Sequence, residues 1–155
     1  MQISIPGYRD LDIQNIVFDY NGTLANGGVA NDEIKASLES LSRIFSIYVI
    51  TADTFGTVKE ELKELNLEVV VLKSSNHTQE KANFIKELGV NKTISIGNGN
   101  NDKEMLKNAV ISIAVIGNEG CSTEALLSSN IVVNSIKDAI DILTNSKKMV
   151  ATLRC

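Results

Sequence analysis

The sequence predicts one α/β domain with a doubly wound, Rossmann-like and mainly parallel sheet of about six strands and helices on both faces. Short β-branched runs alternate with amphipathic segments along the whole chain. Several of the runs, such as 47–50, are apolar at successive positions, as parallel strands covered on both faces require. The 155 residues, 43% of them hydrophobic, suffice for one core, so a single domain is expected to span residues 1–155.

The predicted strands are short runs rich in valine and isoleucine, with turn-forming residues between them and the next helical pattern. They are Ile13–Asp19, Ser46–Thr51, Leu67–Leu72, Thr93–Ile96, Val110–Ile116 and Ile131–Val133. Folds of this class bind ligands at the carboxyl ends of their strands, so functional residues are expected there.

Between the strands, apolar residues recur at the spacing of one helical face. These sets are Ile34, Leu38, Leu41 and Phe45; Val58, Leu62 and Leu65; and Ile136, Ile140 and Leu143. The second set follows Thr57 and the third follows Ser135, each with an acidic residue three positions later, which is the spacing of a capping box. Further helices are predicted at Gln79–Leu88, Asp102–Ala109 and Ser122–Ser128.

Composition excludes several classes of function. With 15 basic and 19 acidic residues the net charge is −4, and no basic block is present, so no nucleic-acid partner is expected. The longest near-apolar stretch, 109–117, falls well short of the roughly 20 residues of a membrane span. The amino terminus does not resemble a secretion signal, and the two cysteines suggest no disulfide framework. A cytoplasmic protein without a membrane partner is therefore expected.

Polar residues follow several of the predicted strands, and each group also has an ordinary structural explanation. Asp19 leads into Asn21-Gly22, which can be a tight turn, and Thr51 can simply end a strand. The segment 97–102 offers oxygens to a hard cation, but it can equally be an Asx-rich turn before a helix. A lone lysine near a helix start, such as Lys81, is normally solvated.

Taken together and in this order, these groups resemble a known signature. Asp19-x-Asn21-Gly22-Thr23, then Thr51, Lys81 and Gly97-Asn98-Gly99-x-Asn101-Asp102 are similar to the four motifs of the haloacid dehalogenase (HAD) superfamily of phosphohydrolases and phosphotransferases. The resemblance covers residues 13–143. It is strongest to the phosphorylation domain of P-type ATPases, whose first motif reads Asp-Lys-Thr-Gly-Thr, and to small soluble proteins similar to that domain.

The resemblance implies a mechanism and a set of site residues. Asp19 would be the nucleophile that forms an aspartyl phosphate, Thr51 would bind the transferred group, and Lys81 would keep Asp19 ionised. Mg²⁺ would be held by Asp19, the main-chain carbonyl of Asn21, and Asn98 or Asp102. The substrate-binding set that the motifs imply is Gly22, Thr23, Thr51, Ala52, Lys81 and Asn101.

Two positions depart from the superfamily pattern. Asn21 stands where phosphatases usually have the aspartate that acts as general acid and base, and an amide cannot exchange a proton near neutral pH. Because general acid–base catalysis is typically worth ~10²–10⁴ in rate, slow turnover is expected. Asn98 also replaces an aspartate, which should weaken Mg²⁺ binding. The alternative is a catalytically weak pseudo-phosphatase that binds a partner or a phosphorylated ligand.

No cap domain fits between the motifs, and the Asn26-Gly27-Gly28 turn leaves room only for a small flap. An open site suggests a bulky or macromolecular phosphorylated substrate, a phosphorylated small molecule or nucleotide, or a homo-oligomer in which a neighbouring subunit acts as lid. The tail after Asn145 mixes basic and apolar residues, and its alternatives are to dock on this domain or on a sister subunit. A receiver domain is disfavoured, because its acceptor aspartate would follow the third strand, which here ends Leu72-Lys73-Ser74.

Overall fold

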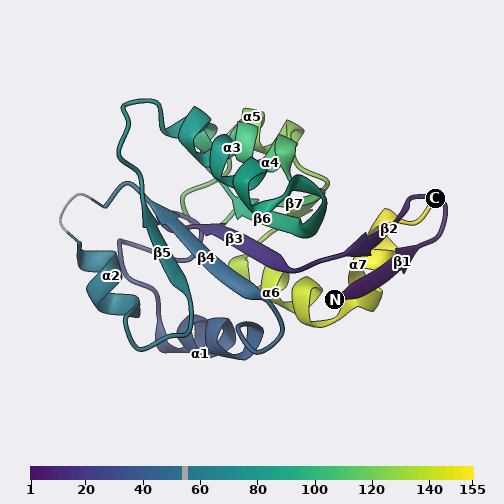
Figure 1. The fold of residues 1–155 in the computed structure, drawn as a ribbon, viewed down its shortest axis with the longest axis horizontal. Helices are drawn as coiled ribbons and strands as arrows, with labels where there is room; N and C mark the ends of the chain where they lie inside the picture. Colours follow the sequence, from purple (N-terminus) through teal and green to yellow (C-terminus); the bar gives the residue numbers. More distant parts are fainter. Residues whose placement is uncertain (54–55) are drawn as a thin grey trace.

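The computed structural model describes residues 1–53 and 56–155. Within them the main sheet has six parallel strands in the order β5-β4-β3-β6-β7-β8 (Figure 1). The strands are β3 (Asn15–Asp19), β4 (Ser46–Thr51), β5 (Glu68–Val71), β6 (Thr93–Gly97), β7 (Ile111–Val115) and β8 (Ile131–Val133). The chain enters at β3, winds outward through β4 and β5, and returns to β6 on the other side of β3. The predicted doubly wound sheet is confirmed.

Helices cover both faces of this sheet, as predicted (Figure 1). One face carries α1 (Asp32–Leu41), α2 (Thr57–Leu62) and α6 (Ile136–Thr144). The other face carries α3 (His77–Leu88), α4 (Lys103–Asn108) and α5 (Thr123–Leu127), with short 3₁₀ turns at η1 (Val90–Lys92) and η2 (Asn100–Asp102). Among the described residues, no helix has the length and apolar character needed to cross a bilayer.

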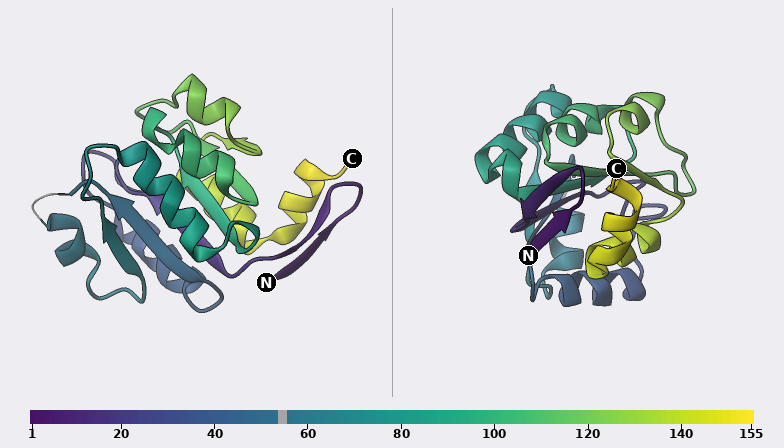
Figure 2. Two further views of the ribbon diagram at one scale, coloured as in Figure 1. Left: turned by 45° about the horizontal axis from the view of Figure 1, so that its top comes forward. Right: turned by 90° about the vertical axis from the view of Figure 1, so that its right-hand side faces the viewer.

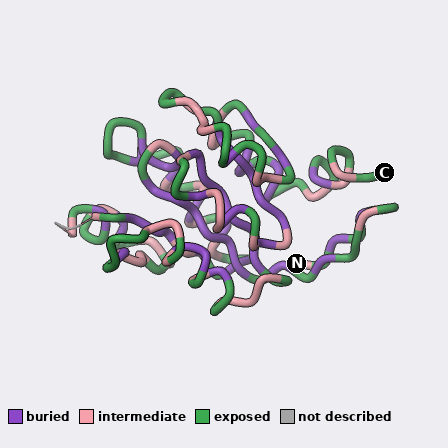
Figure 3. The backbone as a smooth tube through the Cα atoms, turned by 90° about the horizontal axis from the view of Figure 1, so that it is seen from above, coloured by how far each residue is buried: buried purple, intermediate pink, exposed green. Residues whose placement is uncertain are grey.

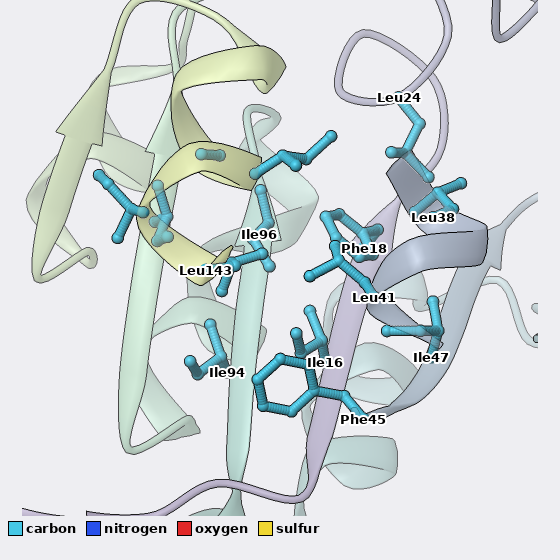
Figure 4. Packing of buried hydrophobic residues seen from close by; sticks show 14 of the residues in the cluster. Ile16, Phe18, Leu24, Leu38, Leu41, Phe45, Ile47, Ile94, Ile96 and Leu143 are labelled. Atoms are coloured by element: carbon cyan, nitrogen blue, oxygen red, sulfur yellow. The ribbon is translucent and has the colours of Figure 1, made fainter. Parts of the chain in front are cut away.

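The core is centred on β3, β6 and β7, which are buried at every position, and the buried trace runs through the middle of the molecule (Figure 3). Apolar side chains of β3 and β6 meet those of α1 and α6 on one face. Labelled in Figure 4 are Ile16, Phe18, Leu38, Leu41, Ile94, Ile96 and Leu143. On the opposite face Val17 and Ile50 pack with Ile85 of α3 and Met105 of α4. Each such side chain contributes about 1.5–3 kcal/mol on burial, which accounts for successive apolar positions in the central strands.

Two helices end earlier than the apolar spacing predicts. α1 stops at Leu41, and Phe45 is buried beyond it, in a turn where the Phe45 amide donates to the Leu41 carbonyl. α2 stops at Leu62, so that Leu65 is partly buried outside the helix. In both cases the chain must leave the helix to enter the next strand, while its apolar residue still packs on the sheet.

The two predicted capping residues have different outcomes. Ser135 caps α6, because its hydroxyl accepts the Asp138 amide at 3.3 Å. The prediction for Thr57 was wrong: Thr57 lies inside α2, and its hydroxyl donates to Asp53 Oδ1 at 3.0 Å. Asp53 Oδ2 accepts the Val58 amide at 2.7 Å, so the start of α2 is tied to the residues that directly follow β4.

The amino and carboxyl ends form a substructure that the sequence analysis did not predict. β1 (Gln2–Ile5) and β2 (Arg9–Asp12) pair as an antiparallel hairpin, and α7 (Ser146–Leu153) lies beside it at one end of the molecule (Figure 2). Met149 of α7 is fully buried in the core cluster that includes Ile3 and Ile5. The tail after Asn145 therefore docks on this domain's own hairpin.

Candidate active site

Three neighbouring strands deliver the first, second and fourth motifs to one edge of the sheet. Asp19 is the last residue of β3 and pairs in register with Ile50, one residue before Thr51 at the end of β4. On the other side of β3, β6 ends at Gly97, so Asn98 follows directly. The site thus lies at the point between β3 and β6 where the winding of the chain reverses, which is where folds of this class bind ligands.

Lys81 reaches these strand ends from α3, on the face of the sheet that also carries α4 and α5. It lies on α3 and is 1% exposed, so the ordinary expectation of a solvated lysine is wrong. Its Nζ donates to Asp19 Oδ1 at 2.6 Å and to Asp102 Oδ1 at 2.7 Å. Charge-assisted bonds of this length, shielded from water, hold all three groups in a fixed arrangement.

Asp102 is anchored by main-chain amides as well as by Lys81. Its Oδ2 accepts the amides of Asn98 at 3.0 Å and Gly99 at 2.8 Å, and the residue is fully buried. A Cβ on Gly97 would lie 2.6 Å from the Asp102 carboxyl carbon, so only glycine fits there. Both Asp102 oxygens are therefore engaged, and the carboxylate mainly positions Lys81 and the loop after β6.

The turn after Asp19 places the Thr23 hydroxyl near oxygens of Asp19 and Asn98, two of the predicted metal ligands. Gly22 adopts a φ of +78°, and its amide donates to Ala25 O at 3.1 Å, which closes the turn. Thr23 Oγ1 then lies 3.3 Å from Asp19 Oδ2 and 3.2 Å from Asn98 Oδ1. A hydroxyl has one hydrogen to donate, so at any moment one of these two oxygens receives no donor from Thr23.

The electrostatics of the cluster favour an additional cation. Burial, and then the charge of Asp102, raise the pKa of the Asp19 carboxyl, while Lys81 and Thr23 lower it; the result is a pKa of about 7. Burial lowers the pKa of Lys81, but the two carboxylates more than offset this, so its pKa lies above the ordinary 10.5 and it stays protonated. With both carboxylates ionised, the three side chains carry one excess negative charge.

In the part of the chain that the structure describes, the side chains of the remaining predicted residues form no hydrogen bond or ion pair with the carboxylate–lysine cluster. Thr51 is 2% exposed, and its hydroxyl accepts the Asp53 amide at 3.2 Å. Ala52, Asn101 and Asn21 are exposed, so none of these side chains belongs to the buried cluster. The Asn21 position, directly before the closed turn, carries an amide rather than a carboxyl group.

The donor groups fit a hard divalent cation, provided that amide and main-chain oxygens take part. In residues 1–53 and 56–155, no three histidine, cysteine, aspartate or glutamate side chains gather closely enough to hold a metal by themselves. Asp19 Oδ2 and Asn98 Oδ1, however, both lie near the Thr23 hydroxyl. Asn21, whose main-chain carbonyl is the third predicted ligand, lies between Asp19 and Thr23 in the sequence. An all-oxygen set that leaves room for waters is what Mg²⁺ prefers.

Sequence reasoning missed a second cluster, which holds the loop after Asp19 in place. Tyr20 is fully buried, and its hydroxyl donates to the Glu61 carboxylate of α2. Glu61 Oε1 also accepts the Ala30 amide at 3.0 Å and lies 3.1 Å from Lys35 Nζ. The flap within this loop is small, as predicted, with Asn26 bridged to Val29. A glutamate on a short amphipathic helix carries no sequence signal that distinguishes it from a solvated one.

A second missed feature is a cavity of about 380 Å³ beside the turn. It lies between the flap, the loop after β7 and the start of α6. Residues that line it include Thr23, Val29, Glu119 and Ile136. These segments are distant in sequence, so no local pattern could have indicated the cavity.

Comparisons with known proteins agree with this architecture. No protein-family model matches the sequence. An uncharacterized protein of Methanocaldococcus jannaschii is 52% identical over 69 residues, which is 44% of this chain and 74% of that protein. A soluble P-type ATPase-like phosphatase of the same organism is 23% identical over 123 residues. That match covers 77% of this chain but 45% of the relative, so the chain spans about half of its length.

Solved structures share the fold over nearly the whole chain. The cobalt-bound deoxy-D-mannose-octulosonate 8-phosphate phosphatase of Haemophilus influenzae has a TM-score of 0.71 and 13% identity, covering 93% of this chain and 94% of that one. The 3-deoxy-D-manno-octulosonate 8-phosphate phosphatase of Moraxella catarrhalis has a TM-score of 0.67 and 18% identity, covering 92% of this chain and 94% of that one.

The catalytic domain of the CPx-ATPase CopB-B is also similar, with a TM-score of 0.61 and 28% identity over 76% of this chain and 46% of that one. Among the elements that the structure describes, no cap domain is evident, as predicted. The strand order and these structural matches together show that the chain has the HAD-like α/β fold of these phosphatases.

Proposed function

We propose that this protein is a Mg²⁺-dependent phosphohydrolase or phosphotransferase that works through an aspartyl phosphate on Asp19. The observation that carries the proposal is the buried Lys81 ammonium bridging Asp19 and Asp102 where three strands end. The free side of Asp19 faces Thr23 and Asn98. The similar Moraxella phosphatase is described in complex with a magnesium ion and phosphate, which supports the same class of ligand here.

In the first step, a carboxylate oxygen of Asp19 bonds to phosphorus while the bond from phosphorus to the leaving oxygen breaks. Lys81 offsets negative charge at Asp19 and on the phosphoryl oxygens, and the Thr51 hydroxyl donates to one of these oxygens. Bound by Asp19, the Asn21 carbonyl and Asn98, Mg²⁺ would supply further charge neutralisation. In the second step water attacks phosphorus, which releases inorganic phosphate and regenerates Asp19.

Turnover is expected to be slow because Asn21 cannot act as an acid or a base. The departing oxygen must take its proton from water, and the water of the second step has no base at this position. A missing general acid–base typically costs ~10²–10⁴ in rate. The aspartyl phosphate should accordingly be long-lived enough to isolate.

The substrate class that fits is a phosphorylated small molecule or nucleotide whose bulk remains outside the buried cluster. With a small flap and no cap, the site is open, and the cavity beside Gly22 and Thr23 is the nearest room for a leaving group. A neighbouring subunit of a homo-oligomer could cover this opening, which stays a prediction. Cys121 and Cys155 are both free thiols, which suits the reducing cytoplasm as the proposed location.

The direct test is a Mg²⁺-dependent assay with p-nitrophenyl phosphate and with ATP, comparing the wild type with Asp19→Asn. We expect the substitution to lower the rate by on the order of 10³-fold or more, because it removes the nucleophile. Intact-mass measurement of the wild type after rapid quenching should reveal one added phosphoryl group. Activity that survives Asp19→Asn unchanged would exclude Asp19 as the nucleophile.

The second candidate function is partner or ligand binding by a catalytically weak pseudo-phosphatase, and the amide at Asn21 specifically favours it. Restoring the carboxyl group with Asn21→Asp separates the two. If only the acid–base is missing, kcat should rise by about tenfold or more, since the exposed side chain can then exchange protons with solvent. An unchanged kcat in Asn21→Asp would instead favour the binding function.

A further inference from the structure

The loop after β7 brings a carboxylate to the edge of the site from outside the four motifs. Glu119 Oε2 lies 2.8 Å from the position that a Cβ on Gly22 would occupy, and Asn98 Nδ2 lies 2.7 Å from that same position. Glu119 and Asn98 therefore flank one point directly above the turn that follows Asp19. Glu119 also lines the cavity that adjoins this turn.

This loop is held against the site on both sides of Glu119. After it, Asn98 Nδ2 donates to the Gly120 carbonyl at 3.1 Å, and the Ser122 amide donates to the Asn98 carbonyl at 2.9 Å. Before it, a Cβ on Gly117 would approach the Gly22 carbonyl to 3.3 Å, so the two backbones lie close together. The position of Glu119 is thus tied to the turn and to Asn98.

The contacts of Asn98 explain why an amide occupies a position where the superfamily has an aspartate. Its nitrogen must donate to the Gly120 carbonyl, which can only accept. An aspartate here would have no hydrogen to donate, and its charge would face both that carbonyl and the Glu119 carboxylate. The loop conformation that brings Glu119 near the turn therefore requires an uncharged donor at position 98.

The Glu119 carboxylate itself is available for a ligand. The residue is exposed, and within the described part of the chain no hydrogen bond or ion pair engages its oxygens. Asn98 Oδ1 and Asp19 Oδ2, by contrast, compete for the single Thr23 hydrogen. Three oxygen-bearing groups thus adjoin the turn, one from the last residue of β3 and one each from the loops after β6 and β7.

We propose that Glu119 stabilises the divalent cation of this site by supplying the negative charge that Asn98 lacks. The inference rests on the proposed function, since the cation belongs to it. Compared with the superfamily pattern, a carboxylate is absent from the loop after β6, at Asn98, and one is present in the loop after β7, at Glu119. This difference predicts that the two positions are coupled: a carboxylate at either one suffices, and carboxylates at both repel each other.

The test measures Mn²⁺ binding by the electron paramagnetic resonance signal of the free ion, in the absence of substrate. The proteins are the wild type, Glu119→Gln, Asn98→Asp, the double variant, and Asp19→Asn to locate the ion. Glu119→Gln should bind Mn²⁺ about tenfold more weakly, as for loss of a supporting metal-site group. The double variant should recover most of that loss. Glu64→Gln, at an exposed position after α2, is the matched control and should bind as the wild type does.

Thermal unfolding in EDTA checks the coupling without metal. Glu119→Gln should melt as the wild type does, whereas Asn98→Asp should melt lower and be partly restored in the double variant. Equal Mn²⁺ affinity of the wild type and Glu119→Gln would overturn the inference and leave phosphoryl transfer standing. Failure of the wild type to bind millimolar Mn²⁺ would overturn the inference together with the metal site. A wild type that binds Mn²⁺ through Glu119 but hydrolyses no phosphate ester would instead refute only the proposed function.

Discussion

At the scale of single residues, the site is organised around one buried ammonium group. Lys81 is 1% exposed and contacts two carboxylates, of which Asp102 faces the interior and Asp19 faces the opening. The amide bonds to Asp102 fix one end of this arrangement, and Asp19 is the most exposed of the three residues. Burial, and then the charge of Asp102, raise its pKa to about 7.

Lys81→Met should therefore be strongly destabilising. It leaves Asp19 and Asp102 buried without their cation, and breaking such a network typically costs about 3–5 kcal/mol. Urea unfolding at pH 7 measures the change in the free energy of unfolding. Lys86→Met, at an exposed position on the same helix, is the control and should stay within about 0.5 kcal/mol of the wild type. A loss below about 1 kcal/mol in Lys81→Met would mean that the carboxylates are not held by the lysine.

At the scale of elements, α2 links the first and second motifs. Asp53, two residues beyond Thr51, binds the start of the helix, and Glu61 near its end holds Tyr20 and Ala30 of the loop that follows Asp19. The geometry of the turn after Asp19 thus depends on a helix that contributes no residue to the buried cluster.

The Glu61 contacts should make stability depend on pH. Burial raises the pKa of Glu61, but the hydrogen bonds from Tyr20, Lys35 and Ala30 lower it by more than burial raises it. The pKa of Glu61 therefore lies below the ordinary 4.5. The carboxylate therefore stabilises the fold fully above pH 4.5 or so, and this contribution is lost as the pH falls below that value. Glu61→Gln should lower the free energy of unfolding by about 1–2 kcal/mol at pH 7.

Urea unfolding between pH 7 and pH 3 tests this expectation. The difference between wild type and Glu61→Gln should shrink as the pH falls, because the wild-type glutamate becomes protonated. Glu64→Gln, just beyond the helix, should follow the wild type throughout. A difference that is constant with pH would show that the charge of Glu61 does not contribute.

At the scale of the whole molecule, the two ends of the chain pack together beside the main sheet. The hairpin β1–β2 and helix α7 pack on each other beside the sheet, and Met149 is buried among Ile3, Ile5 and the main core cluster (Figure 2). The site lies at the opposite, carboxyl ends of the strands. The terminal elements therefore pack on the domain away from the candidate site.

Met149→Ala should destabilise the whole domain, because it opens a cavity in a continuous core. Substitutions of this kind cost about 2–5 kcal/mol, and Lys147→Ala, exposed on the same helix, should cost little. Circular dichroism and tyrosine fluorescence should follow one common unfolding transition in both variants. Separate transitions would indicate that the terminal elements unfold independently of the sheet.

The sequence by itself determined the elements of the sheet and predicted the class of site. Strands such as Ser46–Thr51 and Ile131–Val133 were located to the residue, because runs of apolar, β-branched residues are a local signal. The order of Asp19, Thr51, Lys81 and Asp102 along the chain could likewise be recognised from the sequence. The structure brings Asp19, Lys81 and Asp102 into contact. The hairpin at residues 2–12 was not predicted, since its strands are four residues long and largely polar.

Only the tertiary structure decided what each of these polar residues contacts. Lys81 reads locally as a surface lysine and becomes buried because two carboxylates 62 and 21 positions away receive it. Glu61 and Glu119 have no local pattern that separates them from solvated glutamates, and their positions follow from the packing of α2 and of the loop after β7. Periodicity depends on neighbours in the chain, whereas charge pairing depends on neighbours in space, and these arise only once the sheet has assembled.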